Sequence, residues 1–408
     1  MNLVVHPVSS LSGRVVLPAS KSYSIRAFLI AACGGKSNIK NLSDCDDALV
    51  AARVGKYLRA KKIISKISVG ESGTVLRFLL PLLAQRDGKY MVTGEGTLNG
   101  RPNQHLLQTL RTMGVNVRGT GPQESIPIRF HGGNLLAGKI AIDGSLSSQF
   151  ISALLIACPP LSADTELVIE GKQIVSSDYV DMTLAVLKQA GIVIRKKSPR
   201  HFHIPGGQTF KGLKNFVVPS DYGLAAFLLA AGILVRSQIT LDGHWRKDLL
   251  QADARILSFL AKMNVRRKPH RSIKLKGPRS LKGGNFSLKD CPDLVPIMAV
   301  LAMFAKGPTT LSNIHHARAK ESDRISDLRH ELLKVGADVR EKNNALTIHP
   351  RKQYRSGVLL DPHHDHRLAM AFAVLGLKIG VRIKDIECVK KSYPGFVSDL
   401  HRLGAFKT

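Results

Sequence analysis

Long apolar runs are scarce in this sequence. The longest ones, such as residues 222–235, are shorter than the roughly 18 residues that a bilayer-spanning helix requires. Residues 1–10 also lack the basic start and apolar block of a secretory leader. We therefore expect a soluble protein that is not exported and has no membrane partner.

Closely spaced cysteines are missing as well. The five cysteines are odd in number and widely scattered, at positions Cys33, Cys45, Cys158, Cys291 and Cys388. Their spacing matches neither a zinc site nor a redox dithiol. This pattern fits a reducing cytoplasm, in which Cys33 and Cys158, both in apolar runs, act as small buried hydrophobes.

Acidic residues are few relative to basic ones. The chain has 60 Lys and Arg against 30 Asp and Glu, a formal net charge of +30. Such an excess implies anionic partners. By itself it does not distinguish between nucleic acid, a membrane surface and a small polyanionic substrate.

The main large-scale pattern in the 408 residues is a repeat. Six times, a short polar segment precedes an apolar, Ala/Leu-rich helix, and the segments begin at Ser20, Ser72, Ser147, Ser220, Cys291 and Asp365. After most of them comes an amphipathic helix ending in Gly and a short strand, as at residues 110–117, 187–194 and 332–339. Length and composition favour two or three domains, and six repeats divide into two domains of three.

The two helix types predict how each domain is built. A helix that is apolar on all sides must be buried on all sides. We therefore expect closed domains in which apolar helices bundle inside a shell of strands and amphipathic helices.

The polar segments also predict a binding chemistry. Ser, Thr or Asp at a helix start caps free backbone N–H groups, and the helix start carries a partial positive charge. Several such starts near Arg and Lys would suit a substrate with phosphates or carboxylates. Six ordinary capped helices explain the pattern equally well at this point.

The segments at these helix starts, read in order, carry a family resemblance. They run from Lys21-Ser22-Tyr23-Ser24-Ile25-Arg26 through Gly73-Thr74-Val75-Leu76-Arg77, Gly100-Arg101-Pro102, Ser147-Ser148-Gln149, Pro292-Asp293, Lys320-Glu321-Ser322-Asp323-Arg324, Asp365-His366-Arg367 and Lys391-Ser392-Tyr393-Pro394. In order and content the chain resembles the enolpyruvyl transferase family, and within it the shikimate-pathway enzymes.

The resemblance implies a fold and a reaction. The fold is α/β (α+β), with two similar domains of three βαβαββ-type units around buried helices, an inside-out α/β barrel, and a cleft between them. The expected domains are residues 15–220, mainly for shikimate 3-phosphate, and residues 1–14 with 221–408, mainly for phosphoenolpyruvate. The reaction transfers the enolpyruvyl group of phosphoenolpyruvate to the 5-hydroxyl of shikimate 3-phosphate, without a cofactor, and releases phosphate.

The resemblance also implies the binding residues. Those expected to contact shikimate 3-phosphate are Lys21, Ser22, Arg26, Ser147, Ser148, Gln149, Ser176, Tyr179, Asp293, His316 and Lys320. Those expected to contact phosphoenolpyruvate are Lys21, Gly73, Arg101, Gln149, Arg324, Arg367 and Lys391. Guanidinium forks suit its carboxylate and phosphate oxygens. Without the resemblance, Ser147 and Ser148 would be plain helix caps.

Three residues are implied to move protons. Glu321 is the acid/base at the methylene carbon, while Asp293, assisted by Lys21, helps to activate the attacking hydroxyl. From the residues alone, Asp293 could instead cap a helix. Glu321 could instead be a solvated partner of Arg324 three residues later.

Three positions depart from the family pattern. Glu71 replaces the usual Asn beside an anion site, and should weaken phosphoenolpyruvate binding unless it pairs or turns away. His316 replaces an Asn but keeps a hydrogen-bond donor. The segment Ser220-Asp221-Tyr222-Gly223 is also looser than the usual Asp-Ser-Ser run.

Several alternatives remain. The enzyme acting on UDP-N-acetylglucosamine is the nearest rival, but its loop cysteine is absent near residues 97–102. RNA 3′-phosphate cyclases are built from related units, and residues 266–284 are strongly basic, yet they lack the aromatic residues of single-strand readers. Histidines 363, 364 and 366 are not at metal-ligand spacing, and we expect no metal, no nucleic-acid partner and a monomer.

Overall fold

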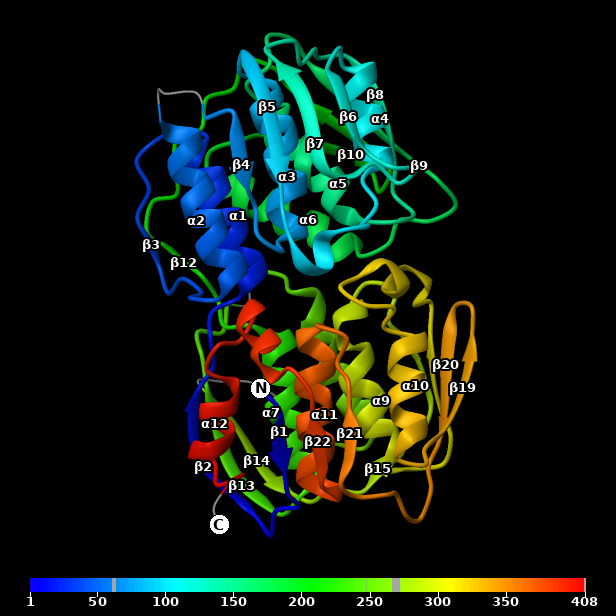
Figure 1. The fold of residues 1–408 in the computed structure, drawn as a ribbon. Helices are drawn as coiled ribbons and strands as arrows, with labels where there is room; N and C mark the ends of the chain where they lie inside the picture. Colours follow the sequence, from blue (N-terminus) through cyan, green and yellow to red (C-terminus); the bar gives the residue numbers. More distant parts are fainter. Residues whose placement is uncertain (61–63, 247, 266–271, 407–408) are drawn as a thin grey trace. The chain divides into compact units, whose positions relative to one another are not determined.

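The computed structural model describes residues 1–60, 64–246, 248–265 and 272–406, which form two compact units. Ser20–Val218 form one, here called the central unit, and Met1–Ala19 with Pro219–Thr408 form the other, called the terminal unit. Figure 1 shows both, coloured along the chain. The chain therefore passes from one unit to the other at residues 19–20 and 218–219.

The central unit contains both predicted helix types. Its apolar helices are α1 (Lys21–Ala32), α3 (Gly73–Ala84) and α5 (Ser148–Ala157), each starting directly after a predicted polar segment. Its amphipathic helices are α2 (Asp46–Arg59), α4 (Gln104–Thr112) and α6 (Ser177–Gln189). In α3, eleven of the twelve residues are buried, as an apolar helix in water requires.

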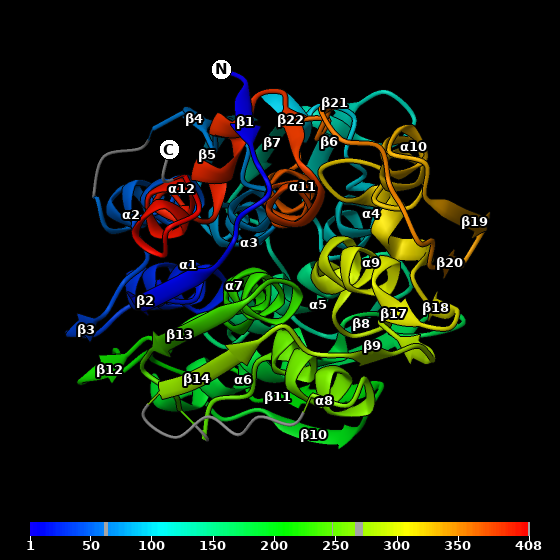
Figure 2. The same cartoon turned by 90° about the horizontal axis from the view of Figure 1, so that it is seen from below.

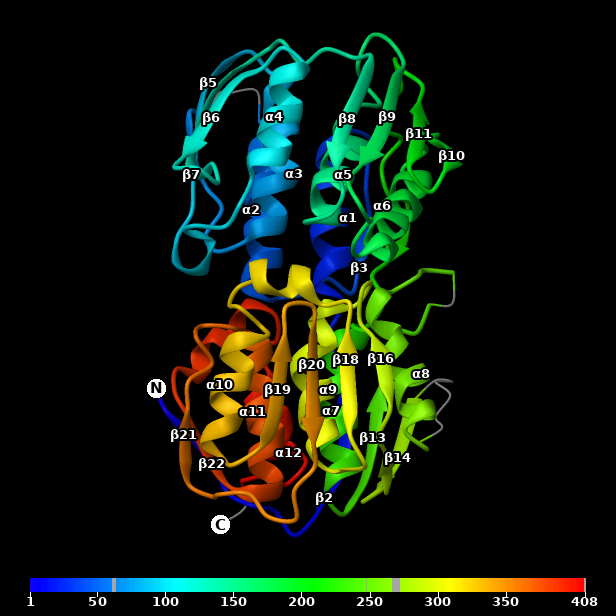
Figure 3. The same cartoon turned by 90° about the vertical axis from the view of Figure 1, so that its right-hand side faces the viewer.

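Strands lie outside these helices (Figure 3). One sheet has the order β4-β5-β7-β6, with β4 (Lys66–Ser68), β5 (Gly88–Thr93), β6 (Asn116–Thr120) and β7 (Ser125–Gly132). A second has the order β10-β11-β9-β8, with β8 (Lys139–Asp143), β9 (Thr165–Glu170), β10 (Arg195–Ser198) and β11 (His201–Ile204). Both follow the predicted βαβαββ pattern. A short parallel pair joins β3 (Ile39–Lys40) to β12 (Phe216–Val217).

The terminal unit repeats this architecture. Its apolar helices are α7 (Tyr222–Leu234), α9 (Val295–Met303) and α11 (His366–Ile379), and every residue of α9 is buried. Figure 2 looks along all three helices. The amphipathic helices are α8 (Arg255–Lys262), α10 (Ser326–Lys334) and α12 (Phe396–Arg402). Side chains of α7, α9 and α11 fill one continuous hydrophobic core.

The terminal strands draw on both chain ends. The sheet β16-β18-β20-β19 has the βαβαββ pattern, with β16 (Asn285–Ser287), β18 (Thr309–Ser312), β19 (Asp338–Lys342) and β20 (Ala345–His349). The sheet β14-β13-β2 joins β2 (Leu11–Val16), β13 (Ser237–Asp242) and β14 (Ser272–Gly277). The others pair β1 (Leu3–Val5), β22 (Val381–Ile383) and β21 (Val358–Leu360), and β15 (Leu281–Lys282) with β17 (Ala305–Lys306).

The mixed α/β class with buried apolar helices is confirmed, and helix capping is confirmed in part. Side chains of Ser72, Ser147, Asp221 and Asp365 accept backbone N–H groups at their helix starts. Ser20 makes no such bond at the start of α1, which corrects that prediction. Within the described ranges, no helix is both long and apolar enough to cross a bilayer. Of the basic stretch, residues 266–271 lie outside the described residues.

Candidate active site

The start of α1 holds a paired lysine. Nζ of Lys21 lies 3.0 Å from Oδ2 of Asp47, the second residue of α2, and both side chains are largely buried. Ser22 follows at the second position of α1 and is half-buried. An anionic ligand at this helix start would therefore compete with the Asp47 carboxylate for the lysine.

Arg26 lies one turn further along α1 and is 1% exposed. Nε donates to Oγ1 of Thr183 at 2.8 Å, Nη1 to the Ser22 carbonyl at 3.0 Å and Nη2 to the Tyr179 carbonyl at 3.0 Å. Burial lowers its pKa to about 10, so it remains a cation at neutral pH. Two of these bonds, to Thr183 and Tyr179, thus tie α1 to α6, while the bond to Ser22 stays within α1.

Arg101 packs against the start of α3. A Cβ atom at Gly73 would lie 2.7 Å from Nη1 of Arg101, so a larger residue there would displace the guanidinium. The side chain of Ser72 accepts the Val75 N–H at 3.4 Å and caps the helix. Glycine at position 73 therefore lets a cation approach the positive end of α3, where an anion would bind to both.

The start of α5 is linked to α3 through Gln149. Its Nε2 donates to Oγ1 of Thr74 at 2.9 Å, and its Oε1 accepts from Nη1 of Arg77 at 2.5 Å. The preceding Ser147 caps α5 by accepting the Gln149 N–H at 3.3 Å. Ser147 thus does act as a cap, while Ser148 is the first helical residue and is 4% exposed.

Ser176 and Tyr179 lie at the start of α6. Ser176 has a left-handed backbone, with φ of 54°, which is uncommon outside glycine and asparagine. Its carbonyl accepts the Tyr179 N–H at 3.0 Å. The ring of Tyr179 lies 5.9 Å from Cζ of Arg26, which connects this pair to α1.

In the terminal unit, Arg324 is the centre of an ionic cluster and is 1% exposed. Nη1 lies 2.6 Å from Oδ1 of Asp293, Nη2 lies 2.9 Å from Oε2 of Glu321 and Nε lies 2.7 Å from Oδ2 of Asp365. Glu321 does pair with Arg324, but its side chain is only 11% exposed and precedes α10. The interpretation of Glu321 as a solvated helix-face residue is therefore wrong.

Asp293 connects two further cations, Arg367 and Lys320, to this cluster. It lies in a 3₁₀ turn (Pro292–Leu294), where its Oδ2 is 2.8 Å from Nη2 of Arg367 and its Oδ1 is 3.6 Å from Nζ of Lys320. The carboxylate thus contacts three cations, which is a different role from that of a helix cap.

The cluster shifts the pKa values of its members. Burial raises the pKa of Asp293, but Arg367, Lys320 and Arg324 together lower it by more, and it lies well below the ordinary range. Burial lowers the pKa of Arg324, but the neighbouring carboxylates raise it by more, so the pKa lies well above the usual value. Both groups are therefore charged at neutral pH.

The remaining predicted residues of the terminal unit are also buried. His316 is 4% exposed, and burial, together with Lys320, lowers its pKa to about 3, so it is neutral at pH 7. Lys391 is 6% exposed in the 3₁₀ segment Ile386–Lys391. The looser segment near α7 also reaches the cluster, because a Cβ at Gly223 would lie 3.1 Å from Nη1 of Arg367.

Glu71 has partners of its own. Its Oε2 accepts from the backbone N–H of Thr97 at 3.2 Å and from Oγ1 of Thr97 at 2.8 Å. The carboxylate is thus held by the loop around Gly96, where a Cβ would lie 2.4 Å from it. These two hydrogen bonds give the Glu71 carboxylate donors from Thr97.

Comparison with known proteins adds the family. The family model described as EPSP synthase (3-phosphoshikimate 1-carboxyvinyltransferase) matches residues 5–400. The chain belongs to the EPSP synthase family. It is 33% identical to the 3-phosphoshikimate 1-carboxyvinyltransferase of Photobacterium profundum, over 98% of this chain and 99% of that protein. The enzyme of the same name from Sulfurovum is also 33% identical, over 99% and 100%.

Solved structures agree with the fold. The chain superposes on the EPSP synthase of Acinetobacter baumannii with a TM-score of 0.79 at 24% identity, covering 99% of this chain and 98% of that one. The enolpyruvyl transferase NikO from Streptomyces tendae gives a TM-score of 0.79 at 19% identity, with the same coverage. The predicted resemblance and the transferase class are confirmed. These comparisons do not favour the UDP-N-acetylglucosamine or RNA-cyclase alternatives.

For this EPSP synthase family member, sequence reasoning missed three supporting residues. Asp47 pairs with Lys21, Arg77 holds Gln149, and Asp365 holds Arg324. Arg77 and Asp365 lie inside the family motifs, and Asp47 follows another acid at a helix start. None of these patterns indicates which residue would be the partner. Partners far apart in sequence become visible only when the chain is folded.

The histidines near α11 have separate partners. His363 Nε2 lies 3.3 Å from Oε1 of Glu331, and His364 Nδ1 lies 2.5 Å from Oδ2 of Asp385. In the described part of the chain, no group of three or more His, Cys, Asp or Glu is placed to hold a metal ion.

Proposed function

We propose that this chain transfers the enolpyruvyl group of phosphoenolpyruvate to the 5-hydroxyl of shikimate 3-phosphate, giving 5-enolpyruvylshikimate 3-phosphate and phosphate. Membership of the EPSP synthase family supports the reaction. The observation that carries the chemistry is the cluster around Arg324, where two carboxylates, Asp293 and Glu321, meet several cations. Proton transfer and anion binding both require such groups.

In this proposal the central unit binds shikimate 3-phosphate. Hydroxyls and backbone N–H groups at the starts of α5 and α6, from Ser147, Ser148 and Ser176, suit its phosphate oxygens. Lys21 and Ser22 contribute a cation and a hydroxyl from α1. Arg26 acts as a positioning residue, because its bonds to Thr183 and to the carbonyls of α1 and α6 order these helix starts.

Phosphoenolpyruvate is proposed to bind the guanidinium and ammonium groups that the family resemblance implies. Arg101 at the start of α3 offers a cation beside backbone N–H groups. Arg324, Arg367 and Lys391 are buried to 6% exposure or less, where water screens their charge weakly. Arginine forks match the carboxylate and phosphate oxygens of this substrate.

The proton steps follow from the balance of the reaction. The substrate hydroxyl attacks C2 of phosphoenolpyruvate and loses its proton while C3 gains one, which gives a tetrahedral intermediate with a methyl group. Loss of a C3 proton then expels phosphate and restores the double bond. Glu321 is proposed to give and take the C3 proton, and Asp293, with Lys21, the hydroxyl proton.

The cluster also supplies a way to activate Asp293. Arg367 is the cation that lowers its pKa most. When oxygens of phosphoenolpyruvate take over Arg367, Asp293 loses that partner and its pKa rises toward the range of a useful proton acceptor. The base would thus be stronger when the substrate is bound.

A cytoplasmic location and a monomeric state stay predictions. Within the described residues the five cysteines form no disulfide with one another, which fits a reducing compartment. Both proposed substrates are small anions, which fits a site rich in cations without a nucleic-acid partner.

The test is a phosphate-release assay on the purified full chain. Release should require phosphoenolpyruvate and shikimate 3-phosphate together, and the product should carry the enolpyruvyl ether by mass spectrometry. Shikimate without its phosphate is the matched control and should turn over poorly. Release without shikimate 3-phosphate, or with only UDP-N-acetylglucosamine as acceptor, would refute the proposal.

A further inference from the structure

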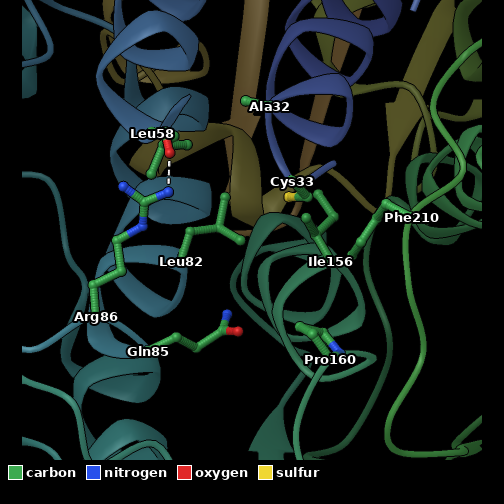
Figure 4. A pocket seen from close by; sticks show the side chains of 9 residues that line it. All are labelled: Ala32, Cys33, Leu58, Leu82, Gln85, Arg86, Ile156, Pro160 and Phe210. Atoms are coloured by element: carbon green, nitrogen blue, oxygen red, sulfur yellow. Dashed lines mark hydrogen bonds between the residues drawn. The ribbon is translucent and has the colours of Figure 1, made fainter. Parts of the chain in front are cut away.

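The central unit has a cavity of about 280 Å³ at the end of the apolar helices opposite to their substrate-binding starts (Figure 4). Its apolar walls come from the last turns of α1, α2, α3 and α5 and from two loop residues: Ala32, Leu58, Leu82, Ile156, Pro160 and Phe210. A twelve-residue helix is about 18 Å long, so the cavity is separate from the helix starts. None of its lining residues belongs to the predicted substrate site.

Three polar side chains border these apolar walls. Figure 4 shows the Cys33 sulfur and the Gln85 amide around the same space, with Arg86 at its edge beside Leu58. Gln85 donates through Nε2 to the Pro81 carbonyl at 3.3 Å, which leaves its Oε1 as an acceptor. Cys33 and Arg86 are partly exposed, so the cavity opens to solvent.

Two arginines offset the partial negative charge of the helix ends at this cavity. Helix C-terminal ends carry about half a negative charge each. Here Arg59 donates to the Ala31 carbonyl at 2.5 Å and Arg86 donates to the Leu58 carbonyl, so each brings a full positive charge to such an end. Among the described residues that line the cavity there is no carboxylate.

The Cys33 thiol adds no negative charge to the cavity. Burial raises the pKa of Cys33 to about 12, although Arg86 and Arg59 oppose the rise, so the thiol is neutral at pH 7. It donates to the Leu29 carbonyl at 3.3 Å. The walls are therefore apolar, and the only charged group among the lining residues is a guanidinium.

Within the described residues, the Arg86 guanidinium makes one hydrogen bond, through Nη2 to Leu58. Its other N–H groups can serve a ligand, and a carboxylate is the natural partner of a guanidinium. A volume of about 280 Å³ lies just below the usual range of ligand pockets, about 300–1,000 Å³, which limits the ligand to a small molecule.

We propose that this cavity is a binding site for a small monocarboxylate with an apolar body, whose carboxylate pairs with Arg86 while the body packs on Leu82, Ile156 and Phe210. The helices that line it, α1, α3 and α5, also carry Lys21, Gly73 and Ser148 at their starts. The site is distinct from the proposed active site and does not depend on the reaction.

The experiment titrates the methyl-labelled full chain with 3-phenylpropanoate and follows Leu and Ile methyl resonances by NMR. Methyl groups of Leu58, Leu82 and Ile156 should shift and saturate. The uncharged isostere 3-phenylpropanamide should bind about 10- to 100-fold more weakly, because it lacks the charge-assisted bonds to Arg86. Equal affinity of acid and amide, or no saturable shift at these methyls, would overturn the proposal.

Variants provide a second, independent comparison. Arg86→Met should weaken 3-phenylpropanoate binding by a similar factor, whereas Arg129→Met, which removes an exposed arginine on β7 of the same unit, should leave it unchanged. If Arg86→Met does not fold, Arg86→Lys keeps the charge without the planar fork and should bind more weakly than the parent. Unchanged binding in the Arg86 variant that folds would contradict the assigned role.

Discussion

The buried His316, whose pKa is influenced by Lys320 and Asp293, makes a quantitative prediction about stability and pH. His316 is 4% exposed, and its pKa is lowered from 6.5 to about 3 in the folded chain, mainly because burial disfavours the charged ring. An unfolded chain releases the ring to water, where its pKa returns to the ordinary value. Replacing His316 with Asn removes this difference.

The sign and size of the change in the free energy of unfolding with pH follow from proton linkage. Below pH 6.5 the unfolded state binds a proton at His316 while the folded state does not, so stability falls as pH falls, until about pH 3. The slope is about 1.4 kcal/mol per pH unit, which gives a loss of about 2 kcal/mol between pH 7 and pH 5. Asp293, whose pKa lies well below the ordinary range, stays ionised across this interval and adds nothing to it.

The assay is urea unfolding of the parent and the His316→Asn variant at pH 7 and pH 5. The parent should lose about 2 kcal/mol more than the variant between these two pH values. His6→Asn, which removes an exposed histidine of the same unit, should behave like the parent. If parent and His316→Asn lose the same free energy, the neutral buried state of His316 is refuted.

Three further predictions concern the proposed chemistry. Asp293→Asn and Glu321→Gln should each lower the rate of phosphate release by about 100-fold or more while the chain stays folded by circular dichroism; unchanged rates in both would refute their roles. Thr97→Val should raise the KM for phosphoenolpyruvate about threefold or more in the parent, because Thr97 holds the Glu71 carboxylate. The same substitution should have no such effect in a Glu71→Asn background, and equal effects in both backgrounds would contradict this prediction. Asp365→Asn should lower the free energy of unfolding by about 3 kcal/mol, because it removes the charge from a buried ion pair, and a change near zero in urea titrations would count against the pair.

Much of the secondary structure could be predicted from local pattern. The apolar helices α7 and α9 could be recognised because a helix with apolar residues on every side has no stable place at the surface. The polar segments marked the helix starts, since Ser and Asp satisfy backbone N–H groups there, as Ser72 and Asp365 do. The ordered motifs identified the family because they span nearly the whole chain.

Local pattern did not predict which groups each side chain would contact in the folded chain. Ser20 stands at a helix start like Ser72 but makes no side-chain cap bond there. The resemblance implies that Arg26 contacts the substrate phosphate, but it did not indicate that the guanidinium also bonds to Thr183 and to the carbonyls of Ser22 and Tyr179. Side-chain direction depends on neighbours that the sequence does not place beside it.

The helix types, the family and the chemical types of the site residues follow from the amino-acid sequence, because periodicity and residue chemistry are local properties. The charge state of His316, the carboxylates that surround Arg324 and the cavity beside Arg86 became visible in the folded chain alone. Burial and the charges of residues distant in sequence set these properties, and both exist only after the chain has folded.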